Sequence, residues 1–482
     1  MPGQYETVIG LEVHVELATR TKIFCGCSTA FGGKPNTHTC PVCTGMPGTL
    51  PVLNRQVLNY AIAVGLATHC EIARYCKFDR KNYFYPDNPQ NYQISQLYLP
   101  LCRNGYVDIE TTEGTKKIGI HEIHMEEDAG KLFHDEQGSC SLVDYNRAGV
   151  PLIEIVSEPD MRSGEEAIAF LENLRTTIQY LGASDCKMNE GSMRADVNLS
   201  VREAGSNVYG TRTEMKNLNS FHAILRAVEG ERARQIALLE SGQSVELETR
   251  RWDEDRATSF PMRSKEDAKD YRYFPDPDLM PVRVSDELIE KIQKSQPELR
   301  PEKKARYQRE FRLPDYDIDI ITGFKHLADI FEETVAICRQ PKKVSNWLMG
   351  ETLRLLKEKD MDSEDICFSP EHLAGLIDLV ERKVITSTVA KEVFELMFEK
   401  DIDPEQYVEA SGLKTVRDEN ALQKAVEEVI ASNPQSVEDY RNGKEKAIGF
   451  LVGQTMKAMK GQADPVRIKE ILRICLTSAN VL

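Results

Sequence analysis

The sequence predicts an α+β protein, in which an antiparallel-sheet domain with a zinc knuckle precedes an all-α domain and a small all-α tail domain. Strand patterns and turns fill residues 1–292, whereas apolar residues recur at helical spacing beyond residue 293. A chain of 482 residues is too long for one ordinary core. We therefore expect three domains, at residues 1–292, 293–405 and 406–482, with the second boundary where Asp401-Ile402-Asp403-Pro404 interrupts the helical pattern.

The first predicted strand spans residues 6–17, where apolar and polar side chains alternate. Its apolar side, which we expect to face the core, consists of Ile9, Leu11, Val13, Val15 and Leu17. Its polar side consists of Glu12, His14 and Glu16. Residues 193–202 repeat this design, and a turn leads on to residues 212–216, which predicts an antiparallel hairpin. The charged residues on the polar side of the hairpin include Arg194, Asp196, Arg212, Glu214 and Lys216.

Four cysteines in a turn-rich segment predict a metal site. One residue separates Cys25 from Cys27, two residues separate Cys40 from Cys43, and twelve residues separate the two pairs. Thiolates with this spacing suit tetrahedral Zn²⁺, and the glycines and prolines around them leave too little apolar material to order the segment by burial. Four thiolates close the coordination sphere, so we expect a structural zinc ion. The alternative is that four small buried side chains cluster here without a metal.

Acidic residues in the predicted strands indicate a second metal, Mg²⁺. Glu154 lies in the middle of the apolar strand 152–156, where a carboxylate must be paired or metal-bound to tolerate burial. Carboxylates and a histidine are the groups that hold hard divalent cations and the phosphates those cations bind. The other side chains expected at this site are Glu12, His14, Glu126, Glu127, Asp196 and Glu214. The alternative is a solvated charged surface.

The usual nucleotide-binding and nucleophilic motifs are missing from the sequence. It contains neither a G-x-x-x-x-G-K-[ST] loop nor a G-x-G-x-x-G turn after a strand. Any ATP would therefore be held by metal ions and by Arg or Lys side chains. No Ser or Cys constellation for acyl transfer is recognisable, and we expect Cys70, Cys76, Cys102 and Cys186 to be core residues.

The C-terminal part combines helical spacing with a basic end. Ser369-Pro370-Glu371 is typical of a helix start, and we expect further helices from Asp418 and from Ala447. From Tyr440 to Leu482 there are eight Lys or Arg and three Asp or Glu, so this end carries +5 and the rest of the chain −21. A basic module on an acidic body suits nucleic-acid capture, although a solvated helical surface accounts for the charge nearly as well.

The compartment is predicted from what the sequence lacks. It does not open with a basic stretch followed by an apolar one, and it has no run of about twenty apolar residues. Twelve cysteines without a secretory signal indicate reduced thiols plus a metal site. We therefore expect a cytoplasmic protein.

Several long segments together resemble one family, the B subunits of the bacterial aspartyl/glutamyl-tRNA amidotransferases (GatB/GatE). The segments are TVIGLEVHVEL at 7–17, KFDRKNYFYPDNPQNYQISQ at 77–96, HMEEDAGK at 124–131, DYNRAGVPLIEIVSEPD at 144–160, GTRTEMKNLNSF at 210–221, DYRYFPDP at 270–277 and GFLVGQTMKAMKGQADP at 449–465. They are particular and span nearly the whole chain, so the sequence is identified as a member of this family.

The resemblance implies a ligase that forms C–N bonds and works as part of a heterotrimer. Such enzymes act on tRNA misacylated with glutamate, aspartate or both. They use ATP to phosphorylate the side-chain carboxylate, and ammonia then displaces phosphate to give Gln-tRNA or Asn-tRNA. The ammonia comes through a channel from an amidase-type glutaminase A subunit, and a small C subunit completes the complex. The implied cofactors are ATP, Mg²⁺ and structural Zn²⁺, and the implied N-terminal fold is a cradle like that of glutamine synthetase.

The resemblance also implies roles for single residues. The family's Mg²⁺ sites correspond by position to Glu12, His14, Glu126, Glu127 and Glu154, and strand geometry adds Asp196 and Glu214. For contacts with phosphate or the substrate carboxylate we expect Arg147, Arg194, Arg212 and Lys216. Ion pairs with neighbouring acids account for these four about as well. For the tRNA we expect Lys444, Lys446, Lys457 and Lys460.

Two other functions are alternatives to that of an amidotransferase subunit. A non-catalytic tRNA-binding scaffold has no use for so many convergent carboxylates. A free-standing ligase that acts on small amino acids has no use for a basic helical tail. Because some family members lack the zinc cysteines, we expect the zinc site to be structural.

Overall fold

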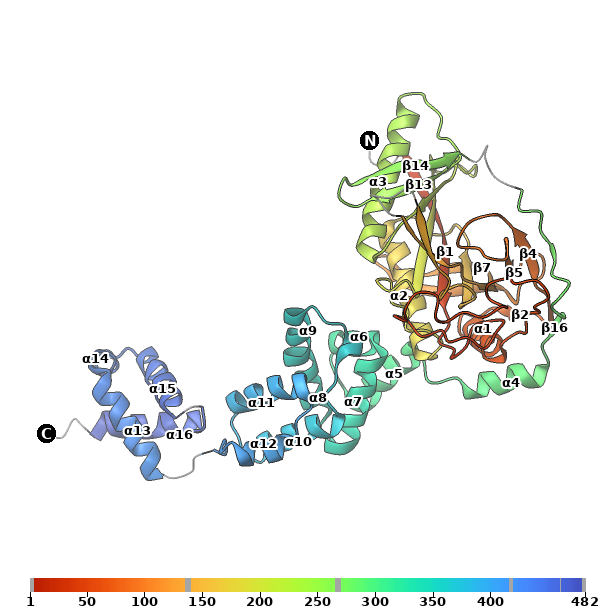
Figure 1. Cartoon of the computed structure of the whole chain (residues 1–482). Coiled ribbons are helices and arrows are strands. Elements are labelled where there is room, and N and C mark those ends of the chain that lie inside the picture. The colour runs from red at the N-terminus through yellow and green to blue at the C-terminus, as the bar shows by residue number, and fades with distance from the viewer. Residues whose placement is uncertain (1–3, 135–139, 265–269, 416–418, 460, 479–482) are drawn as a thin grey trace. The chain divides into compact units, whose positions relative to one another are not determined.

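The computed structural model describes residues 4–134, 140–264, 270–415, 419–459 and 461–478. The chain divides into two compact units, Met1–Leu299 and Arg300–Leu482. All strands of the described residues lie in the first unit, and the described part of the second unit is helical (Figure 1). The prediction of a mixed α+β protein with an N-terminal sheet and a helical C-terminal region is thus confirmed.

The largest sheet of the first unit has nine strands. In spatial order they are β14 (Thr258–Ser264), β13 (Glu248–Asp253), β12 (Thr213–Lys216), β11 (Met193–Glu203), β1 (Tyr5–Glu16), β10 (Pro151–Ser157), β7 (Gly114–Glu127), β6 (Cys102–Thr111) and β2 (Glu71–Ile72). Neighbouring strands are antiparallel except β12 and β13, which are parallel. A parallel pair needs a crossover, and α3 (Phe221–Glu240) lies between these two strands in the chain.

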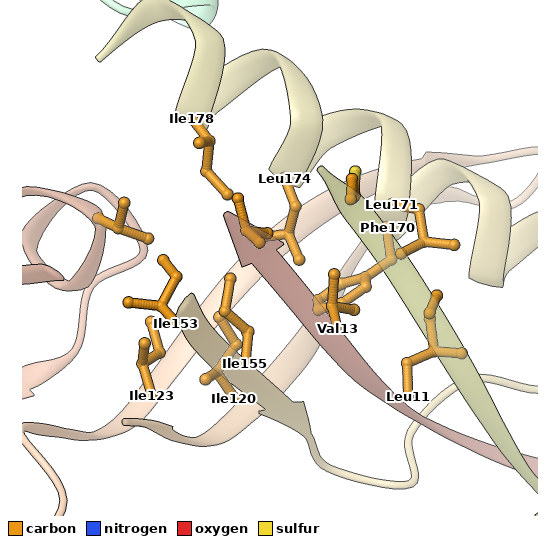
Figure 2. Close-up of a cluster of buried hydrophobic side chains, with 14 of the residues drawn as sticks. Leu11, Val13, Ile120, Ile123, Ile153, Ile155, Phe170, Leu171, Leu174 and Ile178 are labelled. Carbon is orange, nitrogen blue, oxygen red and sulfur yellow. The ribbon is translucent and has the colours of Figure 1, made fainter. Parts of the chain in front are cut away.

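One face of this sheet is apolar and covered by helices. The predicted apolar residues in and next to β1 are all buried, which confirms the first predicted strand. The helix α2 (Gly164–Tyr180) begins after the cap Ser163 and packs Phe170, Leu174 and Ile178 over β1, β10 and β7 (Figure 2). Each such side chain stabilises the fold by roughly 1.5–3 kcal/mol when it is fully buried. Because side chains alternate along a strand, the polar residues of the same strands lie on the opposite face.

The register of the strands decides which polar residues meet. His14 on β1 is opposite Arg194 on β11 and opposite Glu154 on β10, and Glu154 is opposite His124 on β7. The neighbouring cross-strand pairs are Glu12 with Asp196 and Asn198 with Glu214. A slip of one residue would turn every one of these groups into the apolar core. The burial of the apolar face therefore also fixes the polar one.

Smaller elements complete the first unit. Three small sheets pair β15 (Phe274–Pro275), β4 (Asp79–Asn82) and β5 (Tyr92–Ser95), then β16 (Val282–Arg283) with β3 (Tyr75–Cys76), and β8 (Lys131–His134) with β9 (Ser141–Asp144). Two more helices are α1 (Arg55–Ala67) and α4 (Asp286–Ser295). The cysteine-rich segment between β1 and α1 consists mainly of turns, as its glycines and prolines predict.

The second unit contains the predicted helices. Its α-helices are α5 (Arg300–Phe311), α6 (Asp315–Gly323), α7 (Lys325–Cys338), α8 (Pro341–Trp347), α9 (Leu353–Lys359), α10 (Pro370–Glu381), α11 (Ser387–Lys400), α12 (Pro404–Ala410), α13 (Glu419–Ser432), α14 (Pro434–Arg441), α15 (Lys446–Ala458) and α16 (Pro465–Ser478). The starts expected near Ser369 and Ala447 are confirmed by α10 and α15. Asp418 lies outside the described residues, and α13 is described from Glu419 on. No helix of the described chain is long and apolar enough to cross a membrane.

The predicted boundaries at 292 and 405 stay predictions. The second one falls inside α12, whose Val408 is buried, and Thr415 beyond it donates its backbone N–H to Val384. The helices α13 to α16 share a separate core that includes Leu422, Leu451 and Leu472. A cut that respects this packing therefore lies after Thr415.

Candidate active site and metal centres

The first candidate metal centre joins three strands of the large sheet. His14, Glu126 and Glu154 come from β1, β7 and β10, and one potential ligand atom of each lies within 4.8 Å of the others. The His14 Nε2 atom is 3.5 Å from Glu154 Oε2 and 3.8 Å from Glu126 Oε1. An imidazole and two carboxylates thus converge on one point of the polar face.

A second histidine supports this centre. His124 Nε2 lies 3.2 Å from Glu154 Oε2, and its Nδ1 lies 3.2 Å from Glu122 Oε1. Ser95 Oγ donates a hydrogen bond of 3.2 Å to Glu126. The site predicted from the sequence does not include His124. Its alternation with Glu122 and Glu126 along one strand is the signal that could have found it.

The second candidate metal centre is entirely acidic. Glu12, Asp196 and Glu214 come from β1, β11 and β12, and their potential ligand atoms also lie within 4.8 Å of one another. The Lys216 ammonium forms ion pairs with Asp196 and, at 2.9 Å, with Glu214. One lysine faces three carboxylates, so the cluster keeps an excess of negative charge.

Neighbouring polar groups orient the acidic cluster. Asn198 donates a hydrogen bond of 2.9 Å to Glu12, and Thr249 donates one of 2.7 Å to Glu214. The Asn198 side-chain oxygen is buried and has no hydrogen-bond partner among the described residues. A buried oxygen beside three carboxylates is a donor set suited to a hard cation with its bound water. The residues of both centres therefore fit Mg²⁺.

Burial and crowding set the charges at the two centres. Burial raises the pKa of Glu12, and the nearby Glu154 carboxylate raises it further. Burial on its own would raise the pKa of Glu154 and lower that of His14. The ion pairs among Glu154, His14 and His124 outweigh burial, so the Glu154 pKa lies well below its ordinary value and the His14 pKa is raised. A divalent cation would relieve the repulsion between the Glu12 and Glu154 carboxylates.

Glu127 belongs to neither of these clusters. Its carboxylate accepts hydrogen bonds from the backbone N–H of Ile94, at 3.0 Å, and from Gln90, at 3.1 Å. Burial raises its pKa to about 8. The adjacent Glu126 faces the first centre, and neighbours on a strand point to opposite sides. The structure therefore does not bring Glu127 together with the predicted Mg²⁺ ligands.

The predicted phosphate-binding cations are mostly engaged in ion pairs. Arg194 Nη2 and Arg147 Nε lie 2.8 and 3.4 Å from Asp128 Oδ2. Arg147 also donates to the backbone carbonyls of Ala129 and Gly130. Arg212 is exposed and precedes β12, because the ladder with β11 begins only at Thr213. The expectation that Arg212 lies within the hairpin strand is thus wrong, and the phosphate-binding roles stay predictions.

The four predicted zinc cysteines form a compact cluster. One Sγ atom of each of Cys25, Cys27, Cys40 and Cys43 lies within 4.8 Å of the others. Cys43 Sγ is 3.9 Å from Cys40 Sγ and 4.0 Å from Cys27 Sγ. Tetrahedral bonds of about 2.3 Å to zinc place the sulfur atoms about 3.8 Å apart. The cluster therefore has the donor set and the dimensions of a closed zinc site.

Comparison with known proteins decides the family. The family model described as the GatB/GatE catalytic domain matches residues 7–290, which include both candidate centres and the cysteine cluster, and the one described as the GatB domain matches residues 329–476. The chain belongs to the GatB family. It is 70% identical over 468 residues to the B subunit of the aspartyl/glutamyl-tRNA(Asn/Gln) amidotransferase of Agathobacter rectalis, an alignment that covers 97% of this chain and 98% of the relative.

Other relatives give the same result. The protein of the same name from Lachnospira eligens is 67% identical over 476 residues, which is 97% of this chain and 99% of the relative. That from Caldicellulosiruptor saccharolyticus is 58% identical over 473 residues, which is 98% of each chain.

The predicted tRNA-binding lysines lie in the part that matches the GatB domain. Lys444 is exposed in the connection between α14 and α15 and forms an ion pair of 2.9 Å with Asp439. Lys446 and Lys457 are exposed in the first and last turns of α15. Lys460 lies outside the described residues. Their contact with tRNA stays a prediction.

Proposed function

We propose that the chain is the catalytic B subunit of a tRNA-dependent amidotransferase, which converts Glu-tRNA(Gln), Asp-tRNA(Asn) or both to Gln-tRNA(Gln) and Asn-tRNA(Asn). The observation that carries the proposal is the convergence on the polar face of six side chains that could hold metal ions, which come from β1, β7, β10, β11 and β12. This face lies within the part of the chain that matches the GatB/GatE catalytic domain. A scaffold would not require that arrangement.

The reaction needs an activated carboxylate. A carboxylate oxygen of the aminoacyl group attacks the γ-phosphorus of ATP, and ADP leaves. The resulting acyl phosphate then reacts with ammonia, so that a C–N bond forms, phosphate leaves and a proton is lost. When bound, Mg²⁺ would neutralise negative charge on the phosphoryl group that is transferred.

Different residues of the chain would bind the cations and the phosphate groups. His14, Glu126 and Glu154 would hold one cation, and Glu12, Asp196 and Glu214 a second one. Lys216 forms ion pairs with two carboxylates of the second centre, and its ammonium would also meet a phosphate oxygen of the bound nucleotide. Arg194 and Arg147 share Asp128, and Arg194, which lies opposite His14 in the sheet, would contribute positive charge beside the first centre. Together these groups would hold ATP without a glycine-rich loop.

The remaining parts of the proposal concern assembly. The relatives are named as subunits, in accord with a glutaminase A subunit that supplies ammonia through a channel and a small C subunit. The exposed lysines around α15 would contact the tRNA. The cysteine cluster would hold structural zinc, and the sheet would act as a cradle of the glutamine-synthetase type. The complex would work in the cytoplasm.

Two variants in the assembled complex test the proposal. Glu12→Gln and His14→Ala are expected to abolish ATP-dependent formation of Gln-tRNA, while glutamine hydrolysis by the glutaminase partner continues. His121→Ala is the matched control, because it removes an exposed imidazole that pairs with Glu158 away from both centres. Normal transamidation by both site variants would remove the proposed centres from the mechanism.

A second assay separates this function from a tRNA-binding scaffold. A catalytic role predicts phosphate release from ATP that depends on misacylated tRNA and is lost in Glu12→Gln. For a scaffold, tRNA binding and phosphate release would both be the same in Glu12→Gln and in the wild type.

A further inference from the structure

We propose that Lys22 is a positioning residue that couples the zinc cluster to residues 143–150. These residues, here called the 143–150 connection, comprise the end of β9 and the turn that leads to β10, and they carry Arg147. In this proposal the ammonium group of Lys22 neutralises the Cys43 thiolate of the zinc-loaded cluster and holds the 143–150 connection against it. The proposal concerns the architecture of the chain and does not depend on the proposed reaction.

The surroundings of Lys22 are unusual for a lysine. The residue is fully buried, and its Nζ atom lies 3.5 Å from Cys43 Sγ and 3.2 Å from the backbone oxygen of Tyr145. A buried ammonium costs several kcal/mol unless an anion pairs with it. Of these two neighbours, the Cys43 sulfur is the one that can carry a negative charge, and the Cys40 backbone N–H donates to the same sulfur at 3.3 Å.

The chemistry of a four-thiolate site explains this pairing. Four thiolates around Zn²⁺ leave a net charge of about −2, which outer hydrogen-bond donors usually offset. The knuckle offers one backbone N–H and one buried ammonium to Cys43. Lys22 is therefore placed to stabilise the metal-bound form of the cluster more than the metal-free thiol form.

The same connection is bound to the knuckle at several other points. Asn36 donates its side-chain N–H to Val143 and its backbone N–H to Asp144, each at 2.9 Å, and it accepts from the Tyr145 backbone at 2.8 Å. Asn146 accepts from the His38 backbone at 2.8 Å and donates to the Lys34 carbonyl at 2.7 Å. Residues 143–146 are thus fastened to the loop between the two cysteine pairs.

The other end of the connection reaches the candidate active site. The backbone N–H of Gly149 donates to the backbone carbonyl of Asp128 at 2.9 Å, and the Gly149 carbonyl accepts from the backbone N–H of Ile23, the neighbour of Lys22, at 3.0 Å. Gly149 has φ +82°, and a Cβ there would lie 3.5 Å from Lys22 Cδ. The side-chain carboxylate of Asp128 in turn binds Arg147 and Arg194. A continuous set of contacts therefore runs from the zinc cluster to the arginine pair.

The test compares two lysine variants of the full chain. Lys22→Met keeps the apolar stem and removes the charge, and Lys34→Met makes the same change at an exposed lysine of the knuckle. Zinc affinity is measured by competition with a chromophoric chelator. We expect Lys22→Met to weaken zinc binding by roughly 10–100-fold, the usual effect of losing an outer hydrogen-bond donor, and Lys34→Met to leave it unchanged. Wild-type zinc affinity in Lys22→Met would overturn the proposal.

A second measurement needs no variant and so does not depend on whether Lys22→Met folds. Hydrogen exchange is followed in the wild-type chain before and after zinc is removed with a chelator. The amides of residues 145–150 are expected to exchange faster without zinc and to recover when zinc is returned, whereas those of α2 stay protected. Equal exchange of residues 145–150 with and without zinc would contradict the coupling.

Discussion

Glu154→Gln is the substitution that tests the first candidate metal centre most directly. The change keeps the shape of the side chain and removes its negative charge. The Glu154 side chain is 15% exposed and lies 3.2 Å from His124 Nε2 and 3.5 Å from His14 Nε2. Each contact with a charged partner is worth about 1.5–3 kcal/mol, so the two contacts together are worth about 3–6 kcal/mol. Since Glu126 and Glu122 still face the two imidazoles, we expect a loss near the lower end of this range, about 3–4 kcal/mol of unfolding free energy.

The matched control is Glu158→Gln. Glu158 lies just beyond the same strand and also pairs with a histidine, His121, at 3.0 Å. Its side chain is 45% exposed and that of His121 is 62% exposed, so the pair is worth about 0–1 kcal/mol. Urea unfolding in the presence of EDTA measures both variants without metal. Equal stability of Glu154→Gln and Glu158→Gln would refute the reasoning about the buried pair.

Glu154→Gln should also bind metal more weakly than the wild type does. Removal of an outer-shell partner already weakens metal binding by roughly 10–100-fold, so the loss of a direct ligand is expected to weaken Mn²⁺ binding by at least about tenfold. Calorimetric titration of the full chain with Mn²⁺ measures this. Unaltered affinity in Glu154→Gln would exclude the residue as a ligand.

Three further outcomes are expected. Cys40→Ser should release zinc and lower the melting temperature. Metal analysis that finds no zinc in the purified wild-type protein would contradict this prediction. A chain that ends at Thr415 should bind tRNA more weakly and with a smaller salt dependence, and unchanged tRNA affinity of the truncated complex would contradict it. Burial on its own would raise the pKa of Glu231, but hydrogen bonds from Arg234 and Gln235 hold it below its ordinary value of 4.5. The stability from this carboxylate is therefore present above pH 4.5 and lost as the pH falls through the lowered pKa. The free energy of unfolding of Glu231→Gln should be about 3 kcal/mol below that of the wild type at pH 7, and this difference should shrink below pH 4.5. Urea unfolding over this pH range measures the difference, and a difference that stays constant with pH would contradict the prediction.

The strand faces could be predicted from the sequence, and the partners across the strands could not. The alternation along residues 6–17 places Glu12 and His14 on the polar side of β1. It does not reveal that His14 meets Glu154, because pairing between distant strands depends on contacts that no local pattern encodes. The turn-rich cysteine segment is easier to predict, since the metal-ligand spacing is itself local.

Two mismatches have simple physical reasons. Glu126 and Glu127 are adjacent in the sequence, which suggests a common site, yet adjacent residues of a strand point to opposite sides, so only Glu126 reaches the first centre. No local signal points to Lys22, because lysines are rarely buried. Its burial results from the packing of the knuckle against residues 145–149, which are far away in the sequence.

Anomalous scattering from crystals of the full chain, grown with Mn²⁺ and a non-hydrolysable ATP analogue, measures the proposed cation sites themselves. One peak is expected beside His14, Glu126 and Glu154 and another beside Glu12, Asp196 and Glu214. Crystals that bind the nucleotide with no ion at either position would contradict the proposed chemistry.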